Sequence, residues 1–188
     1  MPPLPAEDQR TLQATGARRK APRVPSRTSV VETLRALGNE GGGLVALLDA
    51  DAIGGERHLL SAWAHLGRAR ARGEGRLRDR AAEFALYVAG DDQLPRALAK
   101  VGVSDSTEGF VLVAEKPRSV SQLLIRFDLD PDPTVYPRPP GESTLERLGI
   151  TESDRATVSR SSWEGLILER VALIELTAPH AGSPGAKH

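Results

Sequence analysis

Apolar and polar residues follow a readable order in the central stretch of the chain, residues 81–114. Residues 84–89 and residues 110–113 are two short, β-prone apolar runs bounded by glycine. Between them, apolar residues recur at the i, i+3, i+4, i+7 spacing of one helix face, at Leu94, Ala97, Leu98 and Val101. The pattern predicts a strand, a short helix and a second strand.

The same reading predicts elements on both sides of this unit. Residues 44–48 form an apolar strand buried on both faces, and residues 55–72 form a helix with one apolar and one cationic side. Ser119 caps a helix that ends at Phe127, and the proline-rich residues 128–141 form an irregular loop. The spacing of a capping box, a serine followed three residues later by glutamate, predicts helix starts at Ser29, Ser143 and Ser161.

These elements predict an α+β fold, with a small central sheet flanked by several helices in one domain. The 188 residues suffice for a single core, which we place in residues 28–177. Residues 1–27 are rich in proline and arginine and are expected to form a flexible arm, and residues 178–188 a frayed tail. The segment that begins at Ser161 favours a helix, although its β-branched end is also compatible with a strand.

The amino-acid composition excludes several kinds of chemistry and of partner. The chain has 25 basic and 25 acidic residues, so its net charge points to no particular partner. It has no cysteine, which excludes disulfides and thiol nucleophiles and fits a reducing cytoplasm, the location we expect. No apolar run approaches the roughly 20 residues that cross a bilayer, so we expect no membrane partner.

Catalytic and cofactor motifs are missing from the sequence. It has no phosphate-binding loop, no dinucleotide fingerprint, no zinc-protease motif and no nucleophile elbow. His58 and His65 are seven residues apart on one helix, about 10 Å, which is too far for one zinc ion. Asp49 and Asp51 supply too few oxygens for calcium. We therefore expect no catalytic residue, no metal and no cofactor.

Positive charge is concentrated between residues 57 and 80. The helix at residues 55–72 carries its basic side chains on one face, and further arginines follow it with little acidic dilution. This region is interpreted either as a phosphate-binding surface for RNA or as a set of surface arginines that make ion pairs within the protein. The basic cluster of the arm, Arg18, Arg19, Lys20, Arg23 and Arg27, has the same two interpretations.

The central stretch resembles a known family. An acidic residue before an apolar run (Glu83), a polar turn with Gln93 before a short helix, the sequence Lys100-Val101-Gly102-Val103 and a following apolar strand look like the kinase-binding subunit of the KEOPS complex. The resemblance extends upstream through residues 44–66 and more loosely downstream to residues 164–176, and so covers roughly three quarters of the chain.

The resemblance implies a non-catalytic subunit with two partners. One is the small atypical kinase or ATPase of the KEOPS complex, which the subunit binds and stimulates. The other is transfer RNA, held through its single-stranded 3′ CCA end so that the complex installs threonylcarbamoyladenosine at position 37. With the cationic region, this predicts RNA contacts at Arg57, His58, Arg68, Arg72, Arg76, Arg78, Arg80, Gln93 and Leu94.

Kinase binding requires an exposed apolar patch. The C-terminal segment supplies four candidate residues for it: Leu166, Leu168, Leu173 and Leu176. These leucines are equally compatible with a place in the core. Two other functions compete with the adaptor. One is a stand-alone RNA-binding or ribosome-assembly factor. The other is a small α/β metabolic enzyme, with a site assembled from Asp49, Asp51, Glu83 and His58.

Overall fold

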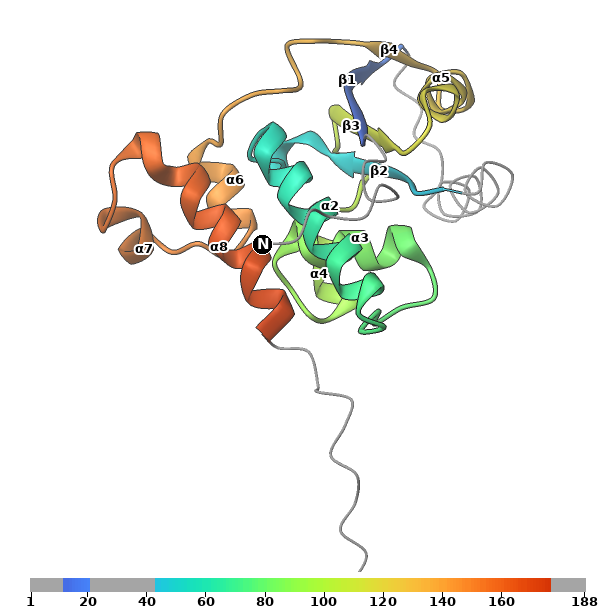
Figure 1. Ribbon diagram of the computed structural model, residues 1–188. Coiled ribbons are helices and arrows are strands. Elements are labelled where there is room, and N and C mark those ends of the chain that lie inside the picture. The colour runs from blue at the N-terminus through green and yellow to red at the C-terminus, as the bar shows by residue number, and fades with distance from the viewer. Residues whose placement is uncertain (1–11, 21–42, 177–188) are drawn as a thin grey trace, which may run out of the picture.

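The computed structural model describes residues 12–20 and 43–176 of the chain. Four antiparallel strands form one sheet in the order β2-β3-β1-β4, with helices on both sides of it (Figure 1). The prediction of one α+β domain, with a small sheet flanked by helices, is confirmed.

Strands β2 and β3 carry core residues on both faces of the sheet. The predicted apolar strands are present as β2 (Val45–Asp49) and β3 (Gly109–Ala114). Successive side chains of a strand point to opposite faces. Val111 and Val113 therefore join the core beneath α2 and α3, whereas Phe110 and Leu112 join a second cluster beneath α5. Burial on both faces explains why the two strands are apolar up to Asp49, the last residue of β2.

Strand β1 (Gln13–Arg19) corrects the prediction of a flexible arm over residues 1–27. It lies between β3 and the short edge strand β4 (Leu129–Pro131), and its small residues gave no strand signal in the sequence. These residues are small because neighbouring backbone packs closely against β1. A Cβ atom at Gly16 would lie 2.6 Å from the carbonyl oxygen of Asp132, so only glycine fits there. Residues 1–11 and 21–27 of the predicted arm lie outside the described residues.

Helix α3 (Arg80–Ala89) contains residues 84–89, so the prediction of a strand there is wrong. The side chain of Asp79 caps the helix by accepting hydrogen bonds from the backbone N–H groups of Ala81 and Ala82, and Gly90 ends it with a left-handed φ of 57°. Every residue from Glu83 to Ala89 is buried. A helix buried on all sides shows no amphipathic period, so its apolar run reads like a buried strand.

The remaining helices are close to the prediction, and the structure adds short ones. The helices predicted at residues 55–72 and 94–101 are present. The C-terminal segment forms a helix, which was the favoured prediction over a strand. The elements other than α3 are η2 (Ala50–Ala52), α2 (Glu56–Ala71), α4 (Leu94–Val101), α5 (Pro117–Arg126), α6 (Glu142–Arg147), α7 (Glu152–Ala156), η3 (Arg160–Ser162) and α8 (Trp163–Leu176). Helix α8 packs against α2 and α3, and α5 packs on the strands β1, β3 and β4.

The predicted capping serines do not cap their helices. Lys116 precedes α5 and Gly141 precedes α6, and α8 follows a 3-10 turn. A capping box does occur at Thr151 and Asp154, where each side chain accepts a hydrogen bond from the other residue's backbone N–H. The helix predicted at Ser29 and the tail at residues 178–188 lie outside the described residues.

The loop predicted over residues 128–141 is irregular apart from strand β4. It contributes Val135 and Tyr136 to the core, and the peptide bond between Tyr136 and Pro137 is cis. Among the described residues, no helix combines the length and the apolar character that crossing a bilayer requires.

Candidate functional site

The cationic face of α2 does not face solvent as a whole, because it lies against α8. Arg57 Nη1 is 3.1 Å from Glu164 Oε2 near the start of both helices. Near their ends, Arg68 Nε is 3.6 Å from Glu175 Oε1 and Arg72 Nη2 is 3.7 Å from Glu175 Oε2. The two helices thus run parallel, and the carboxylates of α8 pair with the arginines that were predicted to bind RNA.

His65 belongs to the same interface. Its Nδ1 atom is 2.8 Å from Glu175 Oε1, a contact that becomes an ion pair when the imidazole is protonated. The ring also stacks on Tyr87 of α3, with 6.3 Å between the centroids. Glu175 therefore contacts three basic side chains of α2, which was not apparent from the sequence.

Arg70 and Arg76 are bound to groups inside the protein. Arg70 Nε donates to Glu83 Oε2 at 2.8 Å, and the backbone N–H of Arg76 donates to Glu83 Oε1 at 2.8 Å. Glu83 is completely buried. The Arg76 side chain donates to the backbone carbonyl of Ile174 near the end of α8. The pair of Arg70 and Glu83 thus organises the connection between α2 and α3.

Arg78 and Arg80 differ in their surroundings. Arg80 Nη1 is 3.1 Å from Glu115 Oε2, and the guanidinium lies over the Trp63 ring at 5.3 Å. The Arg78 side chain is exposed and makes no ion pair with any described residue. Of the arginines predicted to bind RNA, Arg78 is therefore the one most available to a phosphate.

His58 corrects the predicted RNA surface, because its side chain is completely buried. Its Nδ1 accepts the backbone N–H of Gly54 at 3.1 Å, and its Nε2 is 2.8 Å from the carbonyl oxygen of Val88. Since Nδ1 accepts, Nε2 carries the proton and donates it to Val88. Burial lowers the pKa of His58 to about 4. A buried, neutral histidine with both nitrogens bonded contacts no RNA.

The turn before α4 presents Gln93 at the surface, while Leu94 is half-buried against the core. Asp91 stabilises the turn by accepting the backbone N–H of Gln93 at 3.0 Å, and it pairs with Arg96 at 3.0 Å and Lys100 at 3.1 Å. Burial alone would raise the pKa of Asp91, but these hydrogen bonds outweigh it and keep the pKa below its ordinary value. RNA contact at Gln93 and Leu94 stays a prediction.

The four C-terminal leucines fall into two groups. Leu166 and Leu168 are half-buried, and Leu166 packs against the main core. Leu173 and Leu176 keep 47% and 76% of their surface exposed. Leu60, on the exposed side of the neighbouring helix α2, is 44% exposed. Only Leu173 and Leu176 of the predicted set therefore offer apolar surface to a partner.

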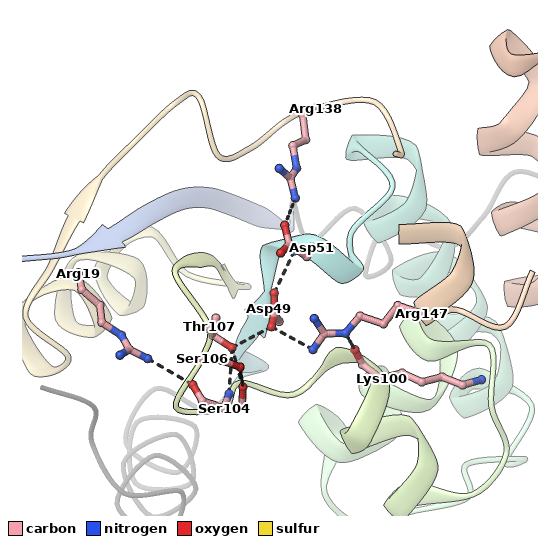
Figure 2. A network of polar contacts seen from close by, with 9 residues as sticks. All are labelled: Arg19, Asp49, Asp51, Lys100, Ser104, Ser106, Thr107, Arg138 and Arg147. Carbon is pink, nitrogen blue, oxygen red and sulfur yellow. Dashed lines mark hydrogen bonds and ion pairs between the residues drawn. The ribbon is translucent and has the colours of Figure 1, made fainter. Parts of the chain in front are cut away.

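A buried polar network, drawn in Figure 2, surrounds Asp49 at the end of β2. Asp49 Oδ2 accepts the Thr107 hydroxyl at 2.8 Å and lies 2.9 Å from Arg147 Nη2. Arg147 also donates to the carbonyl oxygen of Lys100. The network connects the end of β2 to α6 and to the α4–β3 connection. The buried carboxylate of Asp49 is therefore explained by its role in the fold.

The residues of the hypothetical enzyme site are engaged separately. Asp49 binds Thr107 and Arg147, Asp51 pairs with Arg138 above it (Figure 2), Glu83 binds Arg70, and His58 binds two backbone groups. Within the ranges that the structure describes, no group of three or more His, Cys, Asp or Glu side chains is placed to hold a metal ion.

A comparison with models of known protein families finds none that matches this chain, and a comparison with curated proteins likewise finds no match.

Proposed function

We propose that this chain is a non-catalytic accessory subunit of the KEOPS complex. In that role it binds and stimulates the small atypical kinase or ATPase of the complex and helps to recruit transfer RNA through its 3′ CCA end. The complex then installs threonylcarbamoyladenosine at position 37. The resemblance of the sequence supplies the family, and the exposed leucines of α8 are the structural observation that supports an adaptor role.

Leu173 and Leu176 are the basis of the kinase-binding proposal. Three residues apart on a helix, they share one side of α8, and that side points away from the core residues Val171 and Ile174. Large apolar side chains gain free energy when a partner removes them from water. We propose that the kinase covers this side of α8.

Arg78 and the turn at Gln93 are the basis of the RNA proposal. Arg78 supplies an exposed cation without an ion pair among the described residues, as a phosphate contact requires. Gln93 is an exposed amide that can donate to and accept from an unpaired base. The paired arginines of α2 do not support the RNA proposal, because carboxylates of α8 already offset their charge.

Co-purification tests the protein partner. The tagged full-length chain, isolated from its native host after ribonuclease treatment, is expected to retain a small atypical kinase identified by mass spectrometry. The double variant Leu173→Glu/Leu176→Glu should lower the recovered kinase at least tenfold, because two charges would have to be buried in the interface. Ile125→Glu, at the 80% exposed position of α5, is the matched control and should retain the kinase.

Each outcome separates the competing functions. Recovery of no kinase-like protein contradicts the adaptor proposal, and recovery of transfer RNA alone, in a parallel preparation without ribonuclease, favours the RNA-binding factor. Turnover of a substrate by the isolated chain contradicts the non-catalytic role. Equal recovery of the kinase by the wild type and the leucine variant means that another surface binds it.

Charge reversal at Arg78 tests the RNA partner. Arg78→Glu is expected to weaken transfer-RNA binding by about tenfold at low salt and to make the plot of log K against log salt shallower by about one unit. Fluorescence anisotropy over a salt series measures both quantities. Arg126→Glu changes the net charge equally at an exposed position of α5 and should have little effect. Identical behaviour of the two variants would show that only net charge matters.

A further inference from the structure

The interface between α2 and α8 places one carboxylate, that of Glu175, among three basic side chains. We infer that Glu175 is a specificity-determining residue, which prevents polyanions from binding along α2 by occupying its basic side chains. This goes beyond the proposed function, because it concerns a surface from which RNA is excluded and does not require the wild type to bind RNA at all.

Geometry supports this role at the end of α8. Glu175 contacts three basic side chains, His65 at 2.8 Å, Arg68 at 3.6 Å and Arg72 at 3.7 Å. It is 20% exposed, whereas Arg68 and Arg72 are 41% and 45% exposed. The cations thus remain accessible from solvent while the carboxylate that neutralises them is held between the helices.

The position of Glu175 is fixed by the core and not by its charge alone. Val171 and Ile174 of α8 are buried, and Arg76 binds the carbonyl oxygen of Ile174. The backbone that carries Glu175 therefore cannot move away from α2 without loss of core packing. Attraction between charges that are partly shielded from water is screened less by salt than attraction at a fully exposed surface.

Of the two arginines, Arg68 depends more on Glu175. Arg72 has a second partner, Glu74, with 2.8 Å between Arg72 Nε and Glu74 Oε2. Arg68 has no other carboxylate partner among the described residues. Removal of the Glu175 charge should therefore leave Arg68 as a new phosphate contact and Arg72 as a weaker one.

Glu175→Gln tests the inference with a charge change of one unit and little change in shape. We expect the isolated full-length variant to bind a single-stranded oligouridylate about fivefold more tightly at 50 mM salt, and its salt slope to become steeper by about 0.7. Glu169→Gln is the matched control, because Glu169 is exposed on the same helix and makes no ion pair within the described part of the chain. It should leave affinity and slope near the wild-type values.

Two further variants and a matched control make the result decisive. Adding Arg68→Gln to Glu175→Gln should reverse the gain in affinity. Arg68→Gln/Arg72→Gln in the otherwise wild-type chain should lower the affinity no more than Arg126→Gln/Arg160→Gln, which removes two exposed cations that make no ion pair with a described residue. Equal affinities of Glu175→Gln and Glu169→Gln would overturn the inference. So would a larger loss of affinity in Arg68→Gln/Arg72→Gln than in Arg126→Gln/Arg160→Gln, because it would mean that polyanions already bind along α2. Neither result depends on Arg78 or on a kinase, so this test and those of the proposed function fail independently.

Discussion

Glu83→Ala is expected to lower the free energy of unfolding by about 3 kcal/mol, near the lower end for removal of one partner from a buried ion pair. Glu83 is completely buried, and its carboxylate accepts hydrogen bonds from Arg70 Nε and from the backbone N–H of Arg76, both at 2.8 Å. Without it, the guanidinium of Arg70, which is 30% exposed, loses its counter-charge and the Arg76 N–H loses its acceptor. Urea unfolding at pH 7 measures the change.

Glu74→Ala is the matched control for this loss. Glu74 pairs with Arg72 at 2.8 Å, but both side chains are nearly half exposed, so its removal should cost less than about 1 kcal/mol. Replacement of both buried partners, in Glu83→Leu/Arg70→Met, should recover much of the loss, because no buried charge is left alone. If Glu83→Ala is as mild as Glu74→Ala, the pair does not organise the connection between α2 and α3.

Stability is also expected to fall by about 3 kcal/mol as the pH falls from 6.5 to 4, because of His58. Burial lowers the pKa of His58 from an ordinary value of 6.5 to about 4. Over this range the unfolded chain binds a proton at His58 and the folded chain does not, so acidification favours unfolding. The contribution of His58 is complete above pH 6.5 and is lost progressively down to pH 4.

The variant His58→Gln isolates this contribution. It removes the titrating group, so urea unfolding at a series of pH values should give a smaller loss of stability between pH 6.5 and 4 than in the wild type. Hydrogen bonds from Thr134 and Thr151 keep the pKa values of Asp132 and Asp154 below the ordinary value of 3.8, so the stability they supply is lost only at lower pH. Parallel pH profiles of wild type and variant would contradict a buried, neutral His58.

The partners of the basic side chains of α2 could not be predicted from the periodicity of that helix alone. The period of α2 correctly grouped Arg57, Arg68 and Arg72 on one face, but it gave no information about which element that face meets. The partner, α8, follows about a hundred residues later, and its Glu164 and Glu175 have no local relation to α2. His58 was misassigned for a related reason, since its acceptor, the carbonyl oxygen of Val88, belongs to another helix.

The sequence by itself determined the elements whose signals are local. Amphipathic spacing and end signals predicted α2 and α4, and continuous β-prone runs predicted β2 and β3. Tertiary structure decided the state of α3, because a helix buried on all sides loses its period. It also decided that β1 is a strand, since the small residues of β1 gain their burial from neighbouring strands and from the loop that crosses Gly16. Local physics sets periodicity and caps, whereas burial and charge pairing depend on segments that only the folded chain brings together.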